Sequence, residues 1–369
     1  MKNKQTIILI SILIFLIIVS AGFVGYTIYI KLKENQAVGN NAENNQQNEE
    51  QPPIIVEENK VEIFQGNDRP IAVMIDNQQG AWPQAGLNKA YVVYEIVAEG
   101  GITRLMALFK GQDLNKIGPI RSSRHYYLDY ALEHDAIYVH YGWSPQAESD
   151  IRSLAVNNIN GLVESSSNFW RVKDKSAPHN VVTTTQKILG IAQRKGYRTT
   201  SEAKSVLNYT TNEVTLEQGL NATNITIPHS NYQTVEYKYN EETKRYTRYA
   251  RNKLQTEWDT GEEVTTKNII ITFADNYTLQ DGEEKGRQGI LNIGDLKGYY
   301  ITNGKAIEIT CIKNTRTSQT IYKDVNGNEI EVNDGNTFIH ICPTNAGVKI
   351  EPGEIINIES ENQEEKVIE

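Results

Sequence analysis

The segment with the clearest chemical potential is rich in arginine and is expected at the start of a helix. The heptapeptide Gly-Pro-Ile-Arg-Ser-Ser-Arg ends at Arg124, and a helical stretch follows it. Free backbone N–H groups at a helix N-terminus, the Ser122 hydroxyl and the guanidinium groups of Arg121 and Arg124 together suit a phosphate or a carboxylate. The alternative is that the two arginines form structural ion pairs, for instance with Glu95 or Glu99.

Other polar residues are expected where strands of the same region begin or end. Asp76 and Asn77 follow an apolar run, and Glu99 lies at the tip of a hairpin. Arg104 begins the next strand, and His140 ends a later one. Several of these residues should meet at one edge of the sheet, where open α/β folds commonly bind ligands. The candidate ligand-binding residues are therefore Asp76, Asn77, Glu99, Arg104, Arg121, Ser122, Arg124, His140 and His179.

The carboxylates permit a catalytic interpretation as well. Glu99 and Asp76 could act as a general acid and base on a glycan, with His140 or His179 in the same cleft. The alternative is that these carboxylates accept hydrogen bonds from turn backbone or pair with arginine. The sequence singles out no catalytic residue.

Several common chemistries lack their sequence patterns. His125 and His134 are nine residues apart and do not share a helical face, so they form no two-histidine metal motif. Gly-x-Ser-x-Gly, P-loop and Gly-x-Gly-x-x-Gly patterns are absent. We therefore predict neither a cofactor nor a metal site.

The elements that would position these residues form an α/β domain over residues 61–212. Apolar runs interrupted by helical stretches predict alternating strands and helices. Ser144 followed by Pro145 predicts a helix start, and Gly196 predicts a helix end. The expected strands are residues 71–75, 91–97, 104–109 and 135–140. Three helices are expected: one that ends at about His134, one that begins at Pro145, and one from about Thr184 to Lys195.

A β-rich domain is expected over residues 225–350. Alternating runs around residues 240–243 predict a hairpin, and the Asn-Gly pairs at 303–304 and 326–327 predict two more. Cys311 and Cys342 fall in predicted strands, where they are either two buried thiols or one disulfide.

The N-terminal region predicts a membrane anchor. Residues 7–30 carry no charge, and a helix of this length spans a hydrocarbon layer of roughly 30 Å. We expect residues 1–6 to be a cytoplasmic tail, residues 7–30 a single-pass transmembrane signal anchor, and the bulk of the chain to be extracytoplasmic. Residues 34–60 are rich in Asn, Gln and Glu and predict a disordered tether. Residues 351–369 form an acidic tail.

The charge distribution argues against nucleic acid as a partner. The net charge of −9 comes mostly from the two acidic end segments, and the region between them is nearly neutral. A binder of duplex nucleic acid needs clustered Lys and Arg to neutralise phosphates.

Five segments in order resemble the YerB-like family of Gram-positive bacteria. They are residues 69–77, 94–104, 117–124, 135–140 and 177–180, and residues 300–305 and 322–330 are similar to the family's C-terminal domain. The resemblance implies a two-domain envelope protein without an established activity. Family members are often lipoproteins with a cysteine after the signal sequence, whereas this chain has none before Cys311. Anchoring is therefore expected through the uncleaved helix.

Two functions follow. The first is a membrane-tethered extracytoplasmic binding or accessory module, whose cleft, lined by Arg104, Arg121 and Arg124, recognises an anionic envelope component, such as a cell-wall polymer, or an envelope protein. The alternative is a cell-wall-active hydrolase that uses Glu99 and Asp76.

Overall fold

The apolar runs predicted in both parts of the chain form strands of one large sheet. The computed structural model describes residues 61–283 and 285–352. The predicted cytoplasmic tail, anchor and tether, together with nearly all of the acidic tail, lie outside these residues. Within them, no helix is long and apolar enough to cross a membrane.

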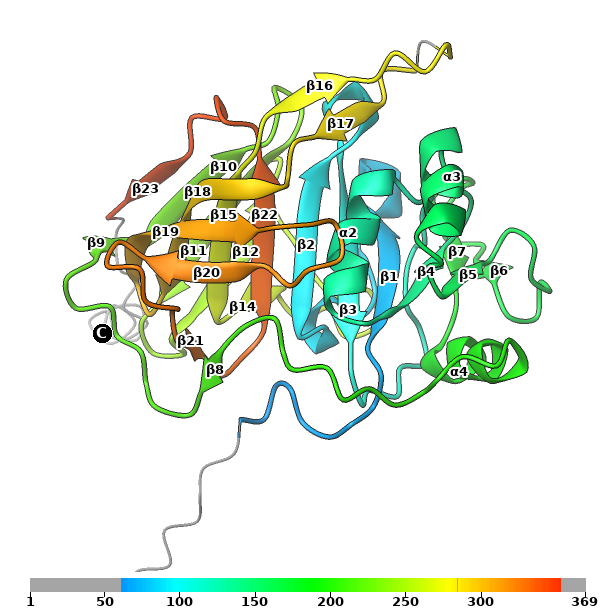
Figure 1. Cartoon of the computed structure of the whole chain (residues 1–369), viewed down its shortest axis with the longest axis horizontal. Helices are drawn as coiled ribbons and strands as arrows, with labels where there is room; N and C mark the ends of the chain where they lie inside the picture. The colour runs from blue at the N-terminus through cyan, green and yellow to red at the C-terminus, as the bar shows by residue number, and fades with distance from the viewer. Residues whose placement is uncertain (1–60, 284, 353–369) are drawn as a thin grey trace, which may run out of the picture. The chain divides into compact units, whose positions relative to one another are not determined.

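The large sheet has eleven strands and mixes parallel and antiparallel pairs (Figure 1). In spatial order they are β20 (Ile321–Asp324), β19 (Lys305–Lys313), β18 (Gly294–Thr302), β15 (Asn268–Phe273), β22 (Thr337–Cys342), β2 (Val92–Val97), β3 (Thr103–Phe109), β1 (Ile71–Asp76), β4 (Ile137–His140) and β5 (Asn158–Asn160), with β9 (Leu220–Asn221) paired to β19. The predicted α/β and β-rich parts are both present, and they share this sheet.

The two parts are joined by β22. This strand pairs in parallel with β15 on one side and with β2 on the other. All six of its residues are buried, as expected for a central strand that is covered on both faces. The two parts therefore meet at the backbone hydrogen bonds between β2 and β22, within one continuous sheet.

A second, smaller sheet covers one face of the large one. Its strands are β13 (Lys253–Leu254), β12 (Arg245–Ala250), β11 (Thr234–Asn240), β10 (Asn224–Pro228) and β23 (Lys349–Glu351), with β14 (Thr265–Thr266) paired to β12. Three further two-stranded pairs are β16 (Asn276–Thr278) with β17 (Gln288–Ile290), β8 (Tyr209–Thr210) with β21 (Val332–Asn333), and β6 (Trp170–Arg171) with β7 (Val181–Val182). The predicted hairpins at 240–243 and 303–304 are confirmed. The one at 326–327 also forms, although its second arm pairs with β20 only through an isolated antiparallel bridge between Lys323 and Glu329.

Within the residues that the structure describes, three α-helices precede the β-rich part, and the starts of α3 and α4 follow capping signals in the sequence. They are α2 (His125–Glu133), α3 (Pro145–Ser153) and α4 (Thr185–Arg194), and short 3-10 turns cover Gln79–Ala81, Leu87–Lys89 and Glu99–Gly101. The Ser144 hydroxyl accepts a hydrogen bond from the Ala147 N–H, and Pro145 occupies the first turn of α3. The Thr184 hydroxyl caps α4 in the same way.

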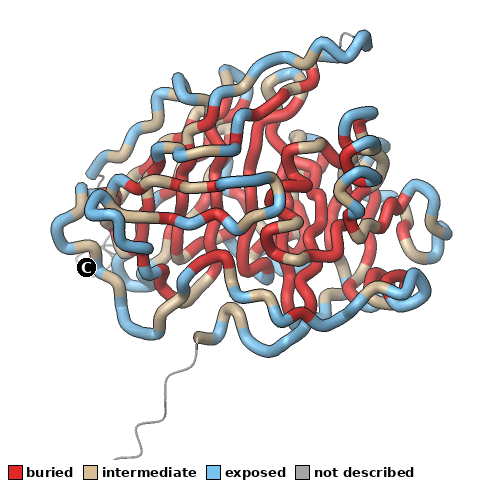
Figure 2. Tube along the Cα trace, in the orientation of Figure 1, coloured by how far each residue is buried: buried red, intermediate tan, exposed pale blue. Residues whose placement is uncertain are grey.

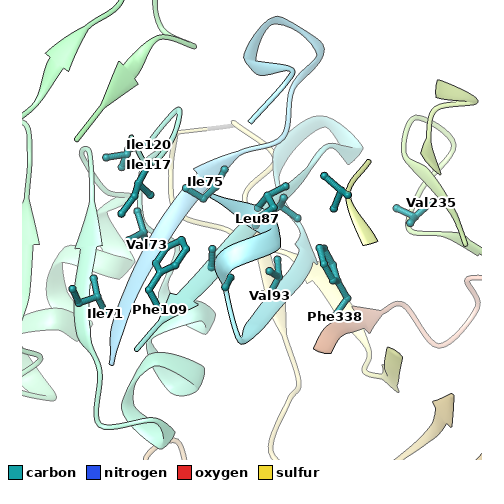
Figure 3. Close-up of a cluster of buried hydrophobic side chains, with 14 of the residues drawn as sticks. Ile71, Val73, Ile75, Leu87, Val93, Phe109, Ile117, Ile120, Val235 and Phe338 are labelled. Atoms are coloured by element: carbon teal, nitrogen blue, oxygen red, sulfur yellow. The ribbon is translucent and has the colours of Figure 1, made fainter. Parts of the chain in front are cut away.

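Alternate residues of β1 enter two different hydrophobic clusters. Val73 and Ile75 pack toward the second sheet, in the cluster drawn in Figure 3 with Val235 and Phe338. Met74 packs on the opposite face, which α2 covers. Each cluster contains residues of both parts of the chain, and the buried strands run without interruption across both (Figure 2).

The two cysteines are free and buried. Cys311 lies in β19 and Cys342 in β22, and two strands separate β19 from β22 in the sheet. The disulfide alternative is therefore wrong, because a disulfide requires neighbouring Cα atoms.

Candidate functional site

A cleft of about 390 Å³ opens at one edge of the large sheet. Strands β1, β4 and β5 are parallel, so their carboxyl ends meet at this edge. The cleft is lined by residues that follow these strands or lie in the loops beside them: Ile120, Arg121, Ser122, Tyr141, Gly142, Trp143, Leu162, Arg171 and Pro178. The predicted location of a ligand site is therefore occupied by a cleft that contains two of the predicted residues, Arg121 and Ser122.

Arg121 is held at the cleft by β1. Its backbone N–H donates to the Met74 carbonyl at 2.9 Å, and its Nε lies 3.3 Å from Oδ2 of Asp76. The Arg121 side chain remains one quarter exposed, whereas the Asp76 side chain is almost fully buried. The buried Asp76 therefore orients the Arg121 guanidinium through Nε, and the two terminal nitrogen atoms of Arg121 remain available to a ligand.

The same Asp76 oxygen binds His179. Nδ1 of His179 lies 2.7 Å from Oδ2 of Asp76, and the other Asp76 oxygen accepts the Gln78 N–H at 3.0 Å. Gly80 leaves room for this arrangement, because a Cβ there would lie only 3.0 Å from Cδ2 of His179. The imidazole thus has a fixed orientation, and its Nε2 faces away from Asp76.

Arg171 is the second cation of the cleft, and the sequence analysis missed it. Its Nη1 donates to Oδ1 of Asn180 at 2.7 Å, and its guanidinium lies 5.5 Å from the centre of the Tyr141 ring. No Asp or Glu within residues 61–283 and 285–352 forms an ion pair with Arg171. Arg171 lies in a two-residue strand inside a loop, which is too short to show any periodicity, so no sequence pattern predicts that Arg171 lies beside Arg121.

Arg104 and Arg124 do not line this cleft. Both guanidinium groups bind Glu99, at 3.3 Å and 2.5 Å, and both side chains are at most one tenth exposed. Arg287 from β17's preceding loop adds a third guanidinium, 3.9 Å from Glu99. Burial raises the pKa of Glu99, but the charges of Arg104 and Arg124 outweigh burial and bring that pKa below its ordinary value. The predicted alternative, a structural ion pair with Glu99, is therefore confirmed for Arg124, and Glu99 stays ionised.

The backbone around Ser122 is already hydrogen-bonded. The Ser122 hydroxyl donates to the Tyr141 carbonyl at 3.1 Å, and the Ser123 N–H donates to the Gly142 carbonyl at 2.9 Å. The expected set of free N–H groups is thus reduced, because this segment pairs with neighbouring loops before α2 begins. The polar groups that remain free at the cleft are therefore mainly those of side chains.

His140 and Asn77 lie inside the protein. Burial lowers the pKa of His140 to about 4, and its ring nitrogens face the Gly142 carbonyl at 2.8 Å and the Asn158 amide at 3.2 Å. Asn77 accepts from the Trp82 indole and donates to Glu95. Both residues support the loops of the cleft without lining it.

Glu95 is the centre of a buried network between the two parts of the chain. One oxygen accepts from Asn77, Thr103 and Gln233, at 3.1, 2.6 and 3.3 Å. The other accepts from Arg248 at 2.7 Å, and both members of this ion pair are fully buried. Since Arg248 lies in β12 and Gln233 directly precedes β11, Glu95 joins the second sheet to β2.

Two histidines beside Glu95 raise the question of a metal. The donor atoms of Glu95, His229 and His340 all lie within 4.8 Å of one another. However, the Arg248 guanidinium already binds the Glu95 carboxylate. The two imidazoles bond each other at 3.0 Å, and Nε2 of His340 bonds the Tyr237 hydroxyl at 2.9 Å. A divalent cation would add charge to a site that already holds a buried cation, so this donor set fits a polar bridge better than a metal centre.

Comparisons with known proteins agree on one family. Residues 58–198 match the family described as “Protein of unknown function (DUF3048) N-terminal domain”, and residues 224–339 match its C-terminal domain. The Bacillus subtilis (strain 168) protein named “Putative lipoprotein YerB” is 33% identical over 294 residues, which is 78% of this chain and 85% of that protein. The crystal structure of YerB from Bacillus subtilis is similar with a TM-score of 0.69, covering 78% of this chain and 94% of that one. The chain therefore belongs to the YerB-like family, whose two DUF3048 domains correspond to the two parts of the shared sheet.

Proposed function

We propose that this protein is a membrane-tethered, extracytoplasmic binding module of the cell envelope, and that its cleft recognises an anionic envelope component. One observation carries the proposal: Arg121 and Arg171, from different loops, line the same cleft. Asp76 partly neutralises Arg121, whereas Arg171 is held by an amide and an aromatic ring. The cleft therefore retains an uncompensated positive charge, which favours a phosphate or carboxylate.

The envelope location rests on two supports. Residues 7–30 are long and apolar enough for a single-pass anchor in the cytoplasmic membrane. The name of the Bacillus subtilis relative contains the words “Putative lipoprotein”, which supports a location at a membrane. A short polar tether would then hold the cleft near the outer face of the cytoplasmic membrane, within reach of a wall polymer or an envelope protein.

Hydrolysis is the second candidate, and it now depends on different residues. Glu99 is fixed between arginines with a lowered pKa, so it is a poor general acid. The contact that favours hydrolysis is the 2.7 Å bond between Asp76 and His179, which resembles the base–orienter half of a triad. A base at His179 would act on a ligand held by Arg121.

The test uses the full-length chain in a nonionic detergent with purified envelope fractions, including peptidoglycan and anionic polymers. We expect retention that Arg171→Gln reduces at least tenfold, while Arg152→Gln, on the exposed face of α3, leaves it unchanged. Mass spectrometry of the same mixtures detects cleavage. New fragments that vanish in His179→Gln would replace the binding function with hydrolysis, and absence of both retention and cleavage would overturn the binding proposal.

A further inference from the structure

The loop that carries Arg171 also carries two lysines and is held by one side chain. Asn180 accepts from Arg171, and its Nδ2 donates to the carbonyls of Val172 at 3.0 Å and Lys175 at 3.1 Å. Asn180 is buried, whereas Arg171 and Lys173 are exposed. A single amide therefore fixes the loop conformation and directs several cations to the surface.

A second cationic position follows at the far end of this loop. Nζ of Lys175 donates to the Trp82 carbonyl at 2.7 Å and lies 4.0 Å from the centre of the Trp258 ring. Nζ of Lys116, from another segment, lies 4.7 Å from the same ring. Two ammonium groups thus share one indole, although they repel each other. Asp259 already pairs with Lys116, so an anion bound here would chiefly offset the charge of Lys175.

The residues between the two positions complete a row. Trp82, which binds Lys175, also donates from its indole to Asn77, the residue after Asp76. Asp76 in turn binds His179 and Arg121. These contacts run through the buried Asn77 and Asp76, and they link the cations of the cleft to those beside Trp258 in one row. We name it the cationic row, and its members are Arg171, Arg121, His179, Lys175 and Lys116.

Acidic groups along the cationic row are fewer than the cations. Asp76 is buried beneath it, and Asp259 pairs with Lys116. Asp174 is exposed on the loop. A ligand with one charge would use only Arg121 and Arg171, leaving the Lys175 and Lys116 pair unused.

We infer that the ligand of the cleft is a linear polyanion, a chain with a phosphate or carboxylate on successive repeats, which extends from the Arg121–Arg171 cleft along the cationic row to Lys175 and Lys116. This inference rests on the proposed binding function and specifies its ligand class. Several weak charge contacts on one chain act together, so affinity rises with chain length. The same contacts make binding sensitive to salt.

The test compares inorganic phosphate, tripolyphosphate and long-chain polyphosphate, with polygalacturonate as the carboxylate polymer, on the full-length chain in nonionic detergent. We expect long-chain polyphosphate or polygalacturonate to bind at least tenfold more tightly than phosphate, and the tighter polymer identifies the charged group. Lys175→Gln and Lys116→Gln should each weaken polymer binding about threefold or more and leave phosphate binding unchanged. Lys175→Arg should restore polymer binding, and Lys349→Gln, an exposed lysine on β23, is the charge-matched control. Unchanged thermal unfolding verifies that each variant is folded.

The outcomes separate this inference from the binding function itself. Phosphate binding that depends on Arg171 but does not strengthen with chain length would overturn the polyanion inference alone. Equal losses in Lys175→Gln and Lys349→Gln would also overturn it, because they would indicate nonspecific attraction. If none of the probes binds, both the binding function and the polyanion inference are overturned.

Discussion

Oδ2 of Asp76 lies 2.7 Å from Nδ1 of His179 and thereby joins the end of β1 to a loop 103 residues later in the chain. Arg121 approaches the same oxygen at 3.3 Å. One buried carboxylate oxygen thus sets the positions of both a cation and an imidazole beside the cleft.

Asp76→Asn should weaken both the fold and the cleft. An amide cannot accept as strongly from His179 and Arg121, so we expect a loss of about 1–3 kcal/mol in the free energy of unfolding. Phosphate binding should fall at the same time, because Arg121 loses its orientation. Urea denaturation and calorimetric titration measure the two effects. Asp174→Asn, an exposed change in the same region, should alter neither, and equal behaviour of the two variants would contradict this role for Asp76.

Arg248→Ala should destabilise the junction between the two sheets. It leaves Glu95 as an unpaired buried charge, for which we expect a cost of about 3–5 kcal/mol. The matched control is Arg152→Ala, which breaks an exposed pair with Glu148 and should cost about 0.5 kcal/mol or less. Urea midpoints that shift equally in the two variants would refute the difference between the buried and the exposed pair.

Both cysteine thiols should resist modification in the folded protein. Burial raises the pKa of Cys311 to about 12 and that of Cys342 well above its ordinary value, so neither forms the reactive thiolate near neutral pH. We expect no reaction with a thiol reagent at pH 8 in the native state and two equivalents after denaturation, without a reductant. Fewer than two equivalents in denaturant would reveal an oxidised pair.

Acid should destabilise the protein through its buried histidines. Burial lowers the pKa of His140 from 6.5 to about 4, so the unfolded chain takes up this proton first as the pH falls. The contribution of neutral His140 to the free energy of unfolding is therefore fully present above pH 6.5. It falls by about 3 kcal/mol as the pH decreases to about 4. His140→Gln should lose correspondingly less stability across this interval in urea denaturation. A pH dependence identical to that of the unsubstituted protein would exclude His140 as a contributor.

Local signals in the sequence predicted local structure well. The hairpin tip predicted at Glu99 is confirmed, and the two glycines that follow it, Gly100 and Gly101, have positive φ between β2 and β3. Ser144 and Asn303 likewise mark a helix start and a hairpin turn. In each case the determining interactions lie within a few residues, so a short window contains them.

Long-range partners could not be predicted in the same way. Glu95 pairs with Arg248, 153 residues away, rather than with the arginines before α2. Arg104 and Arg124 are residue types that often bind anionic ligands, yet both pair with Glu99. The sequence alone could not decide between these roles, because it does not give the distance between two loops. The largely apolar sequence of β22, which only Thr337 and His340 interrupt, was the available signal for a central parallel strand, although it does not identify the strands beside it.

The parallel pairing of β22 with β2 also has a consequence for biosynthesis. β2 is complete at residue 97, whereas its neighbour begins at residue 337. At ordinary rates of translation, the hydrogen-bonding edge of β2 waits on the order of tens of seconds for that neighbour. An unpaired edge of this apolar composition is a template for strand addition by another chain. The nascent chain therefore needs this edge shielded until its last third has emerged, and a product that ends between the two DUF3048 domains would be prone to aggregate.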